Sequence, residues 1–120
     1  MDKKDLTIKE AQKIVEDFLR ERKWFPKDSD TRYYAFCHMV EEIGEAARCI
    51  IKLEHAERKR VTNSDDDNTL KELEMELADI FYHVFKIASA YNIDVDEAFK
   101  KVMEKNRKKF PMEKFKEKKD

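Results

Sequence analysis

The 120-residue sequence predicts an all-α domain, an antiparallel four-helix bundle in which successive helices pack side by side. One observation is the presence of only one Gly and two Pro, too few for the many turns of a β-rich fold. Another is the recurrence of apolar residues at helical spacing in four stretches, separated by short polar connections. Length and composition indicate a single domain, which we place at residues 1–111, followed by a charged, flexible tail at 112–120.

The first helix is expected at residues 7–23. Thr7 and Glu10 have the spacing of a capping box at its start, and an apolar face follows at helical intervals. Pro26 then disfavours helix at the residue before it, which places a break at 24–30. Trp24, the single Trp, has two open roles: closing the end of the bundle, or stacking on a flat ligand.

The second helix is expected from Asp30 or Thr31 to about residue 61. Gly44 in its middle costs roughly 1 kcal/mol relative to Ala, which indicates either close approach of another group or plain tolerance. A polar stretch at 58–67 is the strongest loop candidate, and its acidic triplet at 65–67 is expected to be a solvated loop and helix cap. The core stripe of this helix is expected to be Phe36, Val40, Ile43, Ala47 and Ile50.

The third helix is expected to begin near Asn68 or Thr69 and to carry two adjoining apolar stripes. So wide an apolar band exceeds what one neighbour covers, so this helix is either central or packed on another subunit. Asp94 and Glu97 predict the start of a fourth helix, which Pro111 ends near residue 110. The two stripes of the third helix are Leu70, Leu73, Leu77, Ile80, Val84, Ile87 and Tyr91, and Ala78, Phe81 and Phe85.

Charge and cysteine content narrow the class of protein. Lys plus Arg number 26 and Asp plus Glu 27, a balance that argues against a nucleic-acid partner. No run approaches the roughly 18 apolar residues of a membrane span, and no secretory signal is visible, so we expect a cytoplasmic protein without a membrane partner. Cys37 and Cys49, about 18 Å apart along one helix, cannot pair with each other and are expected to be reduced.

Two acidic pairs, Glu42 with Glu45 and Glu76 with Asp79, each share one face of a helix. Together they would form a four-carboxylate group suited to Mg2+. If the loop between the two helices is centred on Asp65, one pair lies about ten residues further from the loop than the other, so the two pairs would not face each other. They can meet only if the second helix ends early or the segment at 54–67 folds back.

Two other interpretations of the acidic residues exist, and the sequence argues against one of them. A di-iron carboxylate bundle is excluded, because no Glu lies three residues before any of the three His. A non-catalytic helical interaction module, whose acids only face solvent, stays open.

Three motifs also resemble those of the MazG-like nucleoside triphosphate pyrophosphatases, in the all-α superfamily that includes the dCTP pyrophosphatases. They are EEIGE at 41–45, ELAD at 76–79, and KNR at 105–107 followed by Phe110 and Pro111. The likeness covers roughly residues 7–111. It implies Mg2+-dependent hydrolysis of a nucleoside triphosphate between the α and β phosphates, with Mn2+ able to substitute. It also implies a homodimer or homotetramer and an irregular excursion between the acidic motifs.

The resemblance also implies residue roles. The metal ligands would be Glu42, Glu45, Glu76 and Asp79. Glu41 would assist catalysis beside Glu42 and Glu45. Asn106 would contact the nucleoside, Lys105 or Arg107 the phosphates, and Trp24 the base. His38 and His83, each one turn from an expected ligand, are expected to be buried structural residues; the alternative is that they shape the pocket or orient the carboxylates. The motifs do not indicate which base or sugar is preferred.

Overall fold

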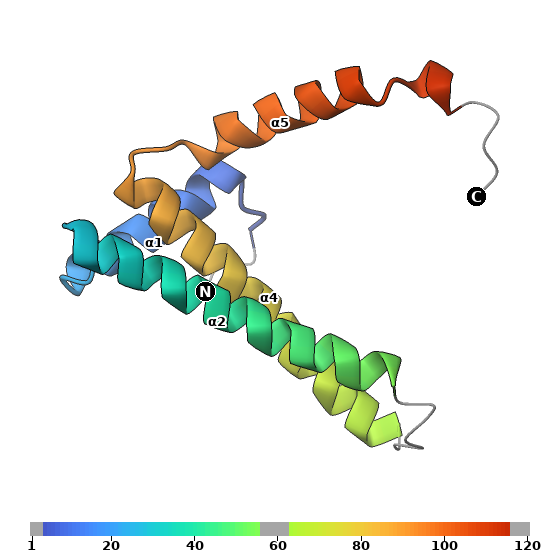
Figure 1. The fold of residues 1–120 in the computed structure, drawn as a ribbon. Helices are drawn as coiled ribbons and strands as arrows, with labels where there is room; N and C mark the ends of the chain where they lie inside the picture. The colour runs from blue at the N-terminus through green and yellow to red at the C-terminus, as the bar shows by residue number, and fades with distance from the viewer. Residues whose placement is uncertain (1–3, 56–62, 116–120) are drawn as a thin grey trace.

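The computed structural model describes residues 4–55 and 63–115 (Figure 1). These ranges contain helices and no strand, so the predicted all-α class is confirmed. In the same ranges, no helix combines the length and apolar character that crossing a membrane requires. The elements are α1 (Ile8–Glu21), α2 (Ser29–Glu54), α4 (Asn63–Ala90), α5 (Val95–Lys109) and the short 3-10 helix η1 (Met112–Lys114). The last of these lies in the predicted tail, of which residues 116–120 are outside the described residues.

Side-chain caps fix the starts of α1 and α5 where the sequence predicts them. The Thr7 hydroxyl accepts a hydrogen bond from the Glu10 N–H at 3.0 Å, and the Glu10 carboxylate accepts one from the Thr7 N–H at 2.9 Å. The Asp94 carboxylate accepts one from the Glu97 N–H at 3.2 Å. Each cap satisfies backbone donors that have no partner inside the helix.

The facing ends of α2 and α4 differ from the prediction. Helix α2 ends at Glu54, seven residues early, while residues 56–62 lie outside the described residues. Helix α4 begins at Asn63, so the predicted loop is wrong for residues 63–67, which are helical. Carboxylates in the first turns of a helix are favoured by its dipole, which explains the longer helix.

The early end of α2 and the early start of α4 place the two acidic motifs at the same height along the helix pair. Glu42 lies twelve residues before the end of α2, and Glu76 lies thirteen residues after the start of α4. In two antiparallel helices, equal distances from the connection place residues at the same height. The early end of α2 therefore removes the expected mismatch.

Helix α4 is central, which is one of the two alternatives that its wide apolar band left open. It packs along α2 on one side and against α1 on another, whereas α5 contacts α1. Figure 1 shows α2 and α4 side by side and α5 leading away from them. The Gln12 side chain ties α1 to the start of α5, because its Nε2 donates to the Ile93 carbonyl at 2.7 Å and its Oε1 accepts from the Val95 N–H at 3.0 Å.

The face that α2 turns inward is not the predicted one. Its buried residues are the small Ala35, Ala46 and Cys49. The side chains expected in the core are instead 47–50% exposed or otherwise on the surface, so that stripe is wrong for the single chain; they are Phe36, Val40, Ile43, Ala47 and Ile50. Small side chains let two helices approach closely, which accounts for the choice of face.

Helix α4 repeats this pattern. Phe81 is 64% exposed and Leu77 is 48% exposed, whereas His83 is buried. The acidic sector of α4 therefore faces α2, and much of the apolar band is left uncovered by the described part of the chain.

Candidate functional site

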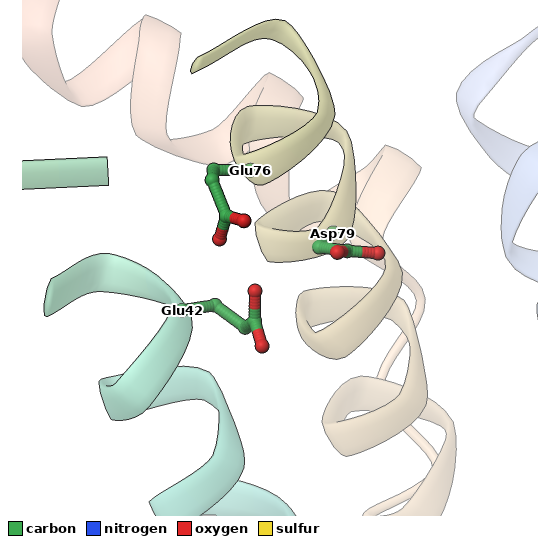
Figure 2. A group of neighbouring side chains, drawn as sticks. All are labelled: Glu42, Glu76 and Asp79. Carbon is green, nitrogen blue, oxygen red and sulfur yellow. The ribbon is translucent and has the colours of Figure 1, made fainter. Parts of the chain in front are cut away.

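Three carboxylates meet between the two long helices. Glu42 comes from α2, and Glu76 and Asp79 come from α4. Each offers an oxygen within 4.8 Å of the others. Figure 2 shows Glu42 and Glu76 pointing toward each other across the gap, with Asp79 one turn further along α4. The antiparallel pairing of the two acidic motifs thus gathers three of the four expected metal ligands.

The pKa of Glu76 is raised by the neighbouring carboxylates and by burial. Its Oε2 is buried and has no hydrogen-bond partner among the described residues. A hydrogen bond with Glu42, then burial, then the charges of Glu42, Asp79 and Glu45 raise the pKa of Glu76 to about 7. Among the described residues, no Lys or Arg forms an ion pair with any of the three carboxylates. Within residues 4–55 and 66–115, the group therefore has no compensating ion pair, and it offers the oxygen ligands that a hard divalent cation prefers.

Glu45 and Glu41 lie beside this group and not in it. The Glu45 carboxylate forms an ion pair with Arg48 at 3.7 Å, although its charge still contributes to the raised pKa of Glu76. Glu41 is exposed on α2. Metal binding by Glu45 and the catalytic roles of both residues stay predictions.

The expected phosphate and nucleoside ligands lie on α5. Lys105, Asn106 and Arg107 are exposed there, and Figure 1 shows α5 leading away from the paired α2 and α4. The single chain therefore does not bring these three side chains to the carboxylates. Their contact with substrate stays a prediction.

Two histidines form the next layer along the α2–α4 contact. The rings of His38 and His83 lie 6.0 Å apart, one turn beyond Glu42 and Asp79 respectively. His83 is buried, and burial lowers its pKa, so its ring is neutral near pH 7. The burial of His83 agrees with the expected structural role, whereas His38 lines a cavity, as the alternative predicts.

A cavity of about 530 Å³ opens beyond the histidines, between α2, α4 and the connection that follows α1. Trp24, 62% exposed, forms part of its wall and also packs edge-on against the Phe18 ring, so both roles expected for it stay predictions. The sequence reasoning missed three other lining residues, Tyr34, Tyr82 and Lys86. A signal was present, because Tyr34 lies two turns before Glu42 and Lys86 two turns after Asp79.

Fold and site together define an all-α domain whose two longest helices hold a carboxylate group for a divalent cation. The family model of the MazG nucleotide pyrophosphohydrolase domain matches residues 34–113, which include both acidic motifs and α5. The chain belongs to the MazG nucleotide pyrophosphohydrolase family, and the predicted resemblance is confirmed. Members of this family generally use a divalent metal. No curated protein and no solved structure was found to match the chain.

Proposed function

We propose that the protein is a Mg2+-dependent nucleoside triphosphate pyrophosphohydrolase that cleaves ribo- or deoxyribonucleotides between the α and β phosphates. The products are a nucleoside monophosphate and pyrophosphate, and such a reaction suits the removal of unwanted nucleotides from the cellular pool. The observation that carries the proposal is the group of three carboxylates, in which the buried Oε2 of Glu76 has no hydrogen-bond partner in the part of the chain that the structure describes. Mn2+ can substitute, because it accepts the same oxygen ligands.

The residues present fit a divalent cation. Glu42, Glu76 and Asp79 would hold it, and Glu45 would join them by exchanging its ion pair with Arg48. When bound, the cation neutralises phosphate oxygens and lowers the pKa of a water. Glu41 is the candidate general base toward the attacking water, with Glu42 and Glu45 orienting that water by hydrogen bonds.

The cavity walled by Trp24 is proposed to take the nucleoside. An aromatic wall suits a base, and the cavity begins one layer of side chains from the carboxylates. Asn106 would contact the nucleoside, and Lys105 or Arg107 the phosphates. Because α5 leads away from α2 and α4, which hold the carboxylates of the same chain, these contacts would require a second subunit or a movement of α5.

A homodimer or homotetramer forms part of the proposal. On α2 and α4, apolar side chains stay about half exposed along two long stripes, including Phe36, Ile43 and Phe81. Apolar patches of this extent on a small domain mark an interaction surface. Light scattering behind size-exclusion chromatography tests it, because a monomer at micromolar concentration would contradict this part. A cytoplasmic location stays a prediction, supported by the free thiols of Cys37 and Cys49.

Pyrophosphate release from a panel of nucleoside triphosphates tests the function. We expect Glu76→Gln and Glu45→Gln to abolish Mg2+-dependent release while helicity by circular dichroism is unchanged. Glu74→Gln, on the exposed side of the same helix, is the matched control and should keep full activity. Wild-type turnover in either site variant would refute the ligand assignment. No hydrolysis and no response to Mg2+ or Mn2+ would favour the non-catalytic interaction module.

A further inference from the structure

Two matching rows of side chains lead from the carboxylates into the cavity. They are Glu42, His38 and Tyr34 on α2, and Asp79, His83 and Lys86 on α4. Neighbours within each row are three or four residues apart, so each row follows one helix face. The rows are joined across the gap by the His38–His83 ring contact. Lys86 lies seven residues from Asp79, a rise of about 10 Å, at the far end of the α4 row.

Lys86 is a cation without a carboxylate partner in the described part of the chain. Its side chain is half-buried, and burial lowers its pKa from the usual range. Its Nζ lies 5.0 Å from the centre of the Tyr82 ring, a cation–π contact that leaves the ammonium N–H groups available as hydrogen-bond donors. Asp30 also lines the cavity, and none of the ion pairs between described residues joins it to Lys86. The cavity wall thus contains a group that only donates hydrogen bonds.

The spacing determines which part of a nucleotide would meet this group. With the α phosphate at the carboxylates, a nucleoside placed in the cavity would have its base beside Trp24, Tyr34 and Tyr82. The edge of the base furthest from the sugar would then be the part that meets Lys86. That edge carries the substituent on C4 of a pyrimidine and on C6 of a purine. Uracil, thymine, guanine and hypoxanthine have an oxygen there that accepts a hydrogen bond, whereas cytosine and adenine have an amino group that donates one.

We propose that Lys86 is a specificity-determining residue that selects nucleotides with a keto oxygen at this edge over nucleotides with an amino group. An ammonium can only donate, so an amino group opposite it leaves both groups without acceptors. A site built around a hydrogen bond rejects the analogue that cannot form it far more strongly than an apolar pocket does. This assignment rests on the proposed function, because it concerns the base of the substrate.

Two substrate pairs that differ at this one edge test the assignment: UTP against CTP, and ITP against ATP. For each pair kcat/KM is measured by pyrophosphate release in Mg2+. We expect the wild type to favour the keto member by at least about tenfold. In Lys86→Gln, whose amide both donates and accepts, the ratio should fall below about threefold through improved use of CTP and ATP. Lys86→Arg should keep the keto preference, and Lys71→Gln, exposed on the same helix, should leave both ratios unchanged.

Equilibrium binding separates this assignment from the proposed function. UMP and CMP are titrated by calorimetry into the wild type and Lys86→Gln in the presence of Mg2+. Tighter binding of UMP that is lost in the variant supports the role of Lys86 even if no triphosphate is hydrolysed. Equal affinity for UMP and CMP in the wild type, no binding of either, or a preference that survives in Lys86→Gln overturns it.

Discussion

Binding of Mg2+ to the three carboxylates should release protons in an amount that Glu76 sets. With a pKa of about 7, Glu76 is largely protonated in the metal-free protein below neutral pH. A divalent cation takes the ionised carboxylate, so the proton leaves as the metal binds. The expected release is about 0.9 proton per ion at pH 6, about 0.5 at pH 7 and about 0.1 at pH 8. The affinity for Mg2+ should accordingly rise with pH over this range.

Calorimetric titration in two buffers of different protonation enthalpy measures this release. At each pH, the difference in observed heat between the buffers gives the number of protons exchanged. Glu76→Gln has no proton to lose at this position, so it should bind Mg2+ more weakly and release almost none. Glu74→Gln should behave as the wild type. A release that is equal at pH 6 and pH 8 would refute the reasoning, because Glu76 would then be ionised before the metal arrives or the metal would bind elsewhere.

Three further predictions concern stability. The raised pKa of Glu76 contributes stability to the folded state that is fully present below the unfolded pKa of 4.5 and is lost as pH rises through about 7. Thermal melts of the metal-free protein should therefore show lower stability at pH 8 than at pH 6. Glu76→Gln should reduce that difference. Gly44→Ala should raise the free energy of unfolding in urea by about 0.5–1 kcal/mol, because the added Cβ would meet no described atom within 4 Å apart from its chain neighbours and the adjacent backbone of its own helix. Gln12→Ala should lower it by about 1–3 kcal/mol, because the Ile93 carbonyl and Val95 N–H lose their partner.

Local sequence signals were sufficient for the class of fold and for several helix ends. Thr7 with Glu10, and Asp94 with Glu97, form the caps that their spacing predicts, because a cap involves only residues within one turn. The end of α2 at Glu54 has no comparable signal, since the residues after it are still good helix formers. The register of the two acidic motifs depends on that end and could not be derived from spacing alone.

The direction of each helix face was harder to predict. Val40 and Ile43 form an apolar stripe on α2, and Ala46 and Cys49 form a smaller one, yet only the second is buried in the single chain. Periodicity reveals both faces, but it does not say whether a face is covered by the same chain or by another copy. The motif pairing found Glu42, Glu76 and Asp79. Lys86 was missed because it belongs to no motif: its spacing places it on the helix face of Asp79, but only the structure shows that this face lines a cavity.

The small side chains buried along α2 bear on which divalent cation the proposed site would prefer. Ala46 lies one turn beyond Glu42, and Cys49 follows it, so side chains that never touch an ion govern how far apart the two helix axes stand. Mg2+ requires oxygens at about 2.0–2.1 Å, and Ca2+ accepts about 2.3–2.6 Å. A bulkier residue at 46 would widen the gap and shift discrimination from the smaller ion toward the larger one. In the proposed Mg2+ site, selectivity would therefore depend on helix packing as much as on the oxygens themselves.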